Sequence, residues 1–310
     1  MGNSIRPLIQ AVRKKFLNTA KWIIGCLYLL VGSPGYKSKI IAFVFHEVSD
    51  TPRAHARLTN TYSTKKNFLK QISLLSATFT LIDSQTDPLW ADKAGCLITF
   101  DDGYRGGLEA AKALEVLGVA SIHLVNLETI YGEINSSALL HFLSVDSAKE
   151  TIWSDSRPKV MAELLPELSK KRLDELSEFS GPYMDSKELQ ELDSLTHAVV
   201  GDHFLNHWYA NSLTKSEIIE NLSRSAQNFS EGHKMKPYFA APHGQLDIGR
   251  MELIGNQGYE VIFSGSSWLK LGNTSIVPRI DMNNSIQSKA SLFGAIAILI
   301  IRSKRKPKNY

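Results

Sequence analysis

The chain has 310 residues, 43% of them hydrophobic, which is enough to bury one large core. Its net charge of +4 conceals an asymmetry, because residues 1–39 hold seven Lys or Arg, residues 291–310 hold five, and neither segment holds an acidic residue. The remaining 23 basic and 31 acidic residues give the body a net charge of −8, a poor surface for nucleic acid, so we expect no nucleic-acid partner.

Residues 1–38 form a basic and apolar N-terminal segment. Its apolar run, 22–31, is well short of the roughly 20 residues that a spanning helix requires. A similar run, 290–301, lies in the C-terminal tail, residues 286–310, and leads into its basic end. Basic charge beside apolar residues is typical of segments on an anionic membrane surface. We therefore expect peripheral membrane association through both tails, and otherwise a cytoplasmic location. The alternative is that the C-terminal run packs on the domain.

Between the tails, residues 39–285 alternate between predicted strands and helices. The apolar, β-rich run 39–46 ends at His46. The next elements that we expect are a helix at 63–77, strands at 78–82 and 97–100, a helix at 105–117 and a strand at 119–125. This alternation predicts a parallel α/β sheet or barrel.

Residues 131–185 interrupt the alternation with charged, helical sequence, which we interpret as an insertion over or beside the site. The elements expected after it are helices at 186–192, 214–229 and 249–257, and strands at 196–201, 237–241, 259–263 and 275–280. Arg279 and Asp281 close the last strand, where a structural ion pair is the simplest role.

Two carboxylates and a glycine follow the strand at 97–100. Asp101 and Asp102 thus stand at the carboxyl end of a predicted parallel strand, where α/β folds build their active sites. Successive side chains of a strand point to opposite faces, so both carboxylates reach one site only if the chain bends, and Gly103 permits that bend. The alternative is that an aspartate caps the following helix.

His203 and His207 follow the strand at 196–201. Two histidines four residues apart on one helical turn face the same way and can share a metal ion. Together with an aspartate from the other strand end, they make a set of two histidines and one carboxylate. That set suits zinc or another first-row divalent ion with positions left for water and substrate. The sequence therefore favours metal-dependent hydrolysis.

In combination, the segment from Thr99 to Gly103 and the pair His203 and His207 resemble the motifs of the polysaccharide deacetylases, the NodB-homology carbohydrate esterases. The resemblance covers about residues 40–281, including Pro242 to Gly244. It implies a distorted (β/α) barrel of about seven strands. It also implies a metal-dependent enzyme, with zinc the preferred ion, that removes an N- or O-linked acetyl group from a sugar of a cell-surface glycan or glycolipid.

The resemblance assigns roles to individual residues. Asp102, His203 and His207 would hold the metal, and Asp101 would take a proton from the attacking water. A backbone N–H near His243, in the turn that begins at Pro242, would help to bind the oxyanion.

The chain departs from the family pattern in its third motif. Ala240 stands where the family has the arginine that orients the base, and His243 stands where it has an aromatic residue. His243 either reaches the sugar or is merely the side chain at a backbone turn. Trp208 either stacks on a sugar ring or packs in the barrel rim.

The family's last motif, a C-terminal strand with a general-acid histidine, is absent here. Permuted members carry that strand at the front, and 40–46 is similar to it. We therefore predict that His46 stands near the metal and protonates the leaving amine or alcohol, with a purely structural role as the alternative. The departures leave one rival function, a catalytically weak relative that binds glycans at a membrane.

Overall fold

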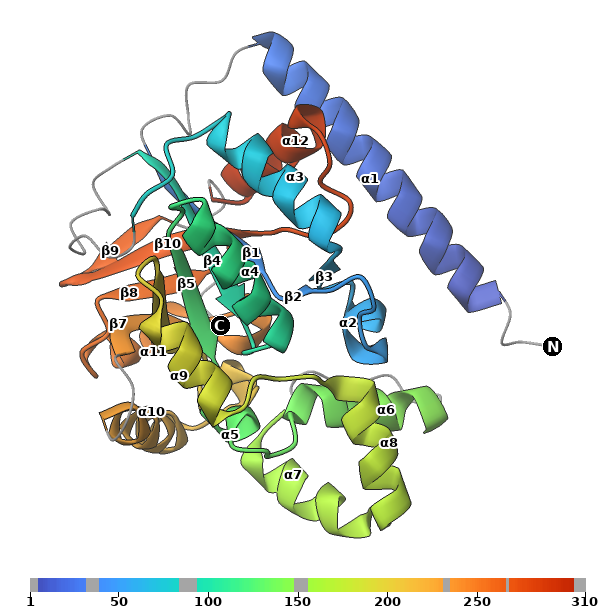
Figure 1. Cartoon of the computed structure of the whole chain (residues 1–310), viewed down its shortest axis with the longest axis vertical. Helices are drawn as coiled ribbons and strands as arrows, with labels where there is room; N and C mark the ends of the chain where they lie inside the picture. Colours follow the sequence, from blue (N-terminus) through green and yellow to red (C-terminus); the bar gives the residue numbers. More distant parts are fainter. Residues whose placement is uncertain are drawn as a thin grey trace.

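A computed structural model of the chain describes residues 5–31, 39–83, 94–147, 156–230, 235–265 and 268–303. Seven parallel strands form a closed barrel, which confirms the predicted fold class (Figure 1). Around the barrel they are β1 (Ile40–Phe45), β4 (Gly95–Asp101), β5 (Ser121–Val125), β6 (Ala198–Asp202), β7 (Met235–Ala240), β8 (Val261–Ser264) and β10 (Thr274–Asp281). Pairing of β10 with β1 closes the ring, with Ala42 opposite Arg279.

The barrel strands are nearly continuous apolar runs because side chains cover both of their faces. Every residue of β1, β4, β5 and β6 is buried. Alternate residues fill the barrel interior, among them Ala42, Leu97, Leu124, Phe263 and Val277. The residues between them face outward and pack under the surrounding helices, as Phe43 and Phe45 of β1 do.

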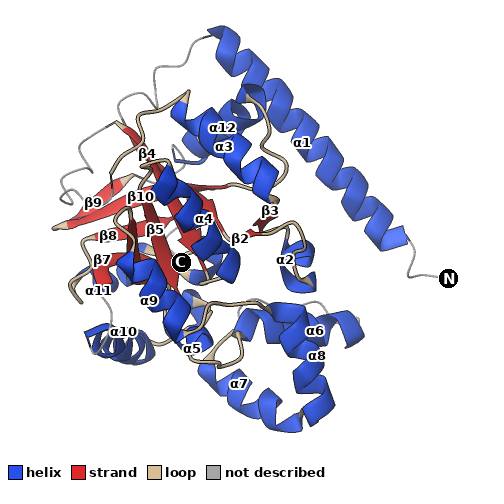
Figure 2. Ribbon diagram, in the orientation of Figure 1, coloured by secondary structure: helices blue, strands red, loops and turns tan. Residues whose placement is uncertain are grey.

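Helices surround this barrel (Figure 2). In chain order they are α2 (Ala54–Thr59), α3 (Lys65–Ser76), α4 (Arg105–Val116), α5 (Leu127–Ile130), α9 (Ser186–Ser194), α10 (Lys215–Ser230) and α11 (Ile248–Gly255). The predicted helix at 63–77 is α3, and its cap is Thr64, whose side chain accepts the Asn67 N–H.

The minor strands differ from expectation. The predicted strand at 78–82 is reduced to a single bridge between Leu81 and Cys96. Three short strands were not expected: β9 (Leu269–Leu271), which runs antiparallel to β10, and the pair β2 (Glu47–Val48) and β3 (Tyr62–Ser63). These short elements carry too little periodic pattern to be recognised in a sequence.

The segment between β5 and β6 is helical, with α6 (Ser136–Ser147), α7 (Pro158–Leu164) and α8 (Lys170–Ser180). Apolar residues of these helices, including Leu139, Met161 and Leu176, form one buried cluster with two phenylalanines of the barrel. These are Phe204, which follows β6, and Phe239 of β7. The insertion therefore packs against the end of the barrel at which β5 and β6 finish.

The two tail helices, α1 (Ile5–Val31) and α12 (Lys289–Ser303), pack against each other outside the barrel (Figure 1). On its other side, α12 buries Leu292, Phe293 and Ile296 in the same core as β1 and β4. The C-terminal apolar run thus packs on the domain, as the alternative interpretation had it. Among the residues that the structure describes, no helix combines the length and apolar character needed to cross a membrane.

Candidate active site

The chain bends after β4 over two residues rather than one. Asp102 has a φ of 73° and Gly103 a φ of 78°, so both lie in the left-handed region that a side chain disfavours. Asp101 and Asp102 consequently face the same point, with Asp101 Oδ2 at 3.9 Å and Asp102 Oδ1 at 3.2 Å from His203 Nε2. Helix α4 begins after Tyr104 without a side-chain cap, so neither aspartate has the capping role.

The strand alternation explains why residues distant in sequence meet here. Asp101 lies four residues beyond Leu97, and His203 lies four residues beyond Val199; both apolar residues face the barrel interior. Side chains an even number of residues apart share a face of a strand, so these residues point into the mouth of the barrel.

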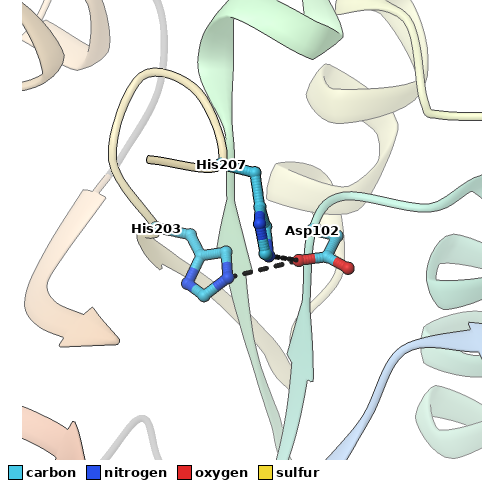
Figure 3. A group of neighbouring side chains, drawn as sticks. All are labelled: Asp102, His203 and His207. Atoms are coloured by element: carbon cyan, nitrogen blue, oxygen red, sulfur yellow. Dashed lines mark ion pairs between the residues drawn. The ribbon is translucent and has the colours of Figure 1, made fainter. Parts of the chain in front are cut away.

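His203 and His207 do not lie on a helical turn, contrary to the expectation from their spacing. The chain after β6 is an irregular loop in which Phe204 has a φ of 62°. Nevertheless both Nε2 atoms point at Asp102 Oδ1, each at 3.2 Å (Figure 3). The predicted grouping of the three residues is present, although the predicted local structure is wrong.

Side-chain hydrogen bonds shape this loop in place of a helix. Asn126 donates to the carbonyl oxygens of His203 and Phe204, and Asn206 accepts the N–H of Ser136 at 2.9 Å. Ser136 Oγ also donates to the carbonyl of His207 at 2.8 Å. Because Ser136 opens α6, the helical insertion helps to fix the position of His207.

The three side chains fit a divalent cation. One ligand atom from each of Asp102, His203 and His207 can be chosen so that all lie within 4.8 Å of one another. His203 Nδ1 lies 2.8 Å from the carbonyl oxygen of Ala240 and donates its hydrogen there, so Nε2, which faces the carboxylate of Asp102, is the ring nitrogen that can bind a proton or a metal ion. Two acceptors at that distance require a positive charge between them, and two imidazole nitrogens with one carboxylate oxygen are a donor set that zinc prefers.

The titration of these groups indicates the same demand for positive charge. Burial raises the pKa of Asp102, but the charge of His207 and the contacts with both imidazoles outweigh burial and hold that pKa well below its usual value. Burial lowers the pKa of His203, while Asp101 and Asp102 raise it more, so that it lies above its usual value. The two carboxylates thus draw a cation to His203 Nε2.

Arg279 takes the place of the arginine that the family pattern has at position 240, where this chain has an alanine. Its Nη1 donates to both oxygens of Asp101, at 2.7 and 2.6 Å, and the pair is buried, with side chains 7% and 3% exposed. Arg279 lies two residues beyond Val277, on the interior face of β10. The expected structural ion pair at this strand end is therefore a contact with the candidate base.

His46 follows β1 directly and stands at the mouth of the barrel. It lies four residues beyond Ala42, an interior residue, and β1 is paired with both β4 and β10. The charge of His46 is among the smaller influences that lower the pKa of Asp102. That His46 stands near the metal and acts as the acid stays a prediction.

The turn from Pro242 to Gly244 also borders the site. His243 has a φ of 62°, and its ring packs edge-on against His207 with centroids 4.5 Å apart. Burial and the neighbouring histidines hold the pKa of His243 well below its usual value, so this ring is neutral. The ring of Tyr209 packs against the same His243 ring with centroids 5.7 Å apart, and the Tyr209 hydroxyl donates to Gln245 Oε1.

Trp208 is not available for stacking on a sugar. It is 6% exposed and belongs to the apolar cluster that joins the insertion to the barrel. The rim-packing alternative is the one found, because the irregular loop turns Trp208 inward while Tyr209 stays half-buried beside His243.

Glu47, next to His46, carries a pH-dependent cost to stability. It is 2% exposed, and burial, opposed by the Arg53 backbone N–H and the charges of Arg53 and Arg57, raises its pKa to about 7. Between the ordinary value near 4.5 and about 7 the folded state binds more protons than the unfolded state, so stability falls as pH rises.

We therefore expect Glu47→Gln to increase the free energy of unfolding by roughly 2 kcal/mol at pH values above the folded-state pKa and to change it little in mildly acidic solution. Urea unfolding on both sides of that pKa measures the difference. Glu178→Gln, at an exposed position, serves as the control. An equal effect of Glu47→Gln at both pH values would contradict the assignment.

No family model and no curated protein matches the sequence. Solved structures do match. IcaB from Ammonifex degensii is 15% identical with a TM-score of 0.57, over 83% of this chain and 97% of that chain. A polysaccharide deacetylase from Bacillus cereus is 14% identical with a TM-score of 0.56, over 83% and 69%. This is the polysaccharide deacetylase fold.

A third structure with this fold, a de-N-acetylase from Aggregatibacter actinomycetemcomitans, is 12% identical with a TM-score of 0.54, over 84% of this chain and 100% of that chain. Identities this low establish the deacetylase fold and nothing finer. The chemistry of this chain has to be argued from the side chains at the mouth of its barrel.

Proposed function

We propose that this chain is a metal-dependent hydrolase that removes an acetyl group, N- or O-linked, from a sugar of a cell-surface glycan or glycolipid. The observation that carries the proposal is the facing arrangement of Asp102, His203 and His207 with a fourth side chain, Asp101, beside it. A set of three protein ligands leaves positions open for water and substrate, which is typical of catalytic rather than structural metal sites.

Asp101 is suited to the role of general base. A divalent cation at the site, with zinc preferred, would polarise the acetyl carbonyl and make water a better nucleophile. Asp101 lies beside the ligands and not among them, because its oxygens are held by Arg279. Arg279 fixes the orientation of the carboxylate through these contacts, and we assign to Asp101 the proton of the attacking water.

The remaining roles concern the leaving group and the oxyanion. We assign to His46, which directly follows the carboxyl end of β1, the donation of a proton to the leaving amine or alcohol. The turn at Pro242 brings the neutral ring of His243 against the ring of His207, one of the candidate ligands. We assign oxyanion binding to this turn.

Metal removal tests the proposal. We expect the purified chain to hold one zinc ion per molecule and to release acetate from an acetylated sugar substrate. Chelation should abolish acetate release, and added zinc should restore it, because polarisation of the carbonyl is lost with the ion. His203→Ala should lose both the ion and the activity, whereas His197→Gln, a histidine outside the site, should keep both.

A chain that holds zinc and binds acetylated glycans without releasing acetate would instead be the glycan-binding relative. The absence of an arginine at position 240 favours that alternative. Arg279 contacts Asp101 instead, so the missing arginine is weak support for a non-catalytic protein. A chain that holds no ion would contradict both functions.

A further inference from the structure

Helix α1 places its large apolar residues on the side away from the protein. Phe16, Ile23, Leu27 and Leu30 are 71%, 48%, 57% and 82% exposed. At 100° per residue they form one stripe, centred opposite Gly25, which is buried. We call these four residues the outward stripe. Trp22 and Leu29, also exposed, lie on a flank of the helix, between the stripe and the side of Gly25.

The inner face of α1 is already occupied. A Cβ atom at Gly25 would lie 1.7 Å from the carbonyl oxygen of Ala290, and a Cβ atom at Gly294 would lie 1.9 Å from that of Lys21. The backbones of α1 and α12 therefore cross in direct contact, and α12 itself packs its apolar residues against the outward-facing residues of β1 and β4. Helix α1 thus turns Gly25 and Tyr28 toward α12 and the outward stripe away from it.

The charge beside this stripe identifies its partner. Residues 1–39 hold seven Lys or Arg, residues 291–310 hold five, and both segments lack acidic residues. A second copy of the chain would bring two such basic segments together, and their repulsion disfavours a dimer through this face. An anionic bilayer complements the charge and receives the apolar stripe in its headgroup region.

We propose that α1 docks on an anionic lipid surface, with the outward stripe in the interface and the helix parallel to the membrane plane. A 27-residue helix extends about 40 Å, so the contact is long enough to fix the orientation of the barrel. In Figure 1 the N-terminal half of α1 continues past α12 along the outside of the domain. The inference does not depend on the proposed catalytic activity.

Flotation of the full chain with vesicles tests this docking. We expect co-flotation with vesicles of phosphatidylcholine and phosphatidylglycerol, weakening as salt is added, and little co-flotation with phosphatidylcholine alone. The triple variant Phe16→Ser, Leu27→Ser and Leu30→Ser should reduce the bound fraction by roughly tenfold or more. Asp102→Ala should float as the unaltered chain does, which separates this inference from the catalytic one.

Val116→Ser with Leu117→Ser is the matched control, because these residues are 87% and 56% exposed and lie at the far end of α4. It should leave flotation unchanged. Unaltered flotation of the triple variant, or flotation independent of phosphatidylglycerol, would overturn the proposal. A lipid-free dimer that the triple variant dissociates would also overturn it, in favour of a second copy.

Discussion

Replacing Asp101 with asparagine is expected to lower kcat for acetate release by roughly 10²- to 10⁴-fold, the usual contribution of a general base. The amide is nearly isosteric and cannot take a proton from water. The zinc content should not change, because Asp102, His203 and His207 form the ligand set without Asp101. Steady-state kinetics with metal analysis of the same preparation measures both.

Two variants make this result interpretable. Asp174→Asn, at an exposed position on α8, should have unaltered kinetics. Asp102→Asn should lose the ion as well as the activity, which distinguishes a ligand from a base. Acetate release that survives in Asp101→Asn would refute the assignment of the base, and loss of zinc in that variant would make Asp101 a ligand instead.

The main features of the fold could be predicted because the barrel strands are buried on both faces. Such strands appear in the sequence as short apolar runs, and a polar residue at the end of each marks the mouth of the barrel. Asp101, the last residue of β4, and His203, directly after β6, are two of these end positions. Adjacent parallel strands finish at the same edge, so residues a hundred positions apart in the chain could be expected to meet.

Arg279 was missed as a partner of Asp101 although a signal for it exists. The two residues are 178 positions apart, and their meeting depends on the closure of the ring between β1 and β10. Which two strands pair when a barrel closes cannot be predicted from the pattern of the sequence. The strand alternation does place Arg279 on the same face as Val277, so an interior arginine at a strand end could have been recognised as a partner for a carboxylate.

The loop that carries His203 and His207 shows the opposite limit. A spacing of four residues is typical of a helix, yet the left-handed Phe204 and the amides of Asn126 and Asn206 shape an irregular loop instead. Those partners come from other parts of the chain, so tertiary contacts override the local pattern. The same loop turns Trp208 into the core, which no local pattern indicates.

Replacement of Arg279 should lower stability and activity together. Arg279→Met leaves the Asp101 carboxylate buried, 3% exposed, without its cation, which is expected to cost about 3–5 kcal/mol of unfolding free energy. It should also lower kcat by roughly 10²-fold, because the base is no longer held in position. Arg279→Lys keeps the charge and should recover part of both losses. Urea unfolding and steady-state kinetics measure these effects.

A double-variant cycle separates the two roles of this arginine. In Asp101→Asn with Arg279→Met the lone buried charge is gone, so stability should recover toward that of the unaltered chain while activity stays absent. Arg224→Met, which breaks an exposed ion pair with Glu128, should change stability by less than about 1 kcal/mol. Lowered stability with an unaltered kcat in Arg279→Met would leave Arg279 a purely structural residue, and Asp101 would then be oriented by something other than this contact.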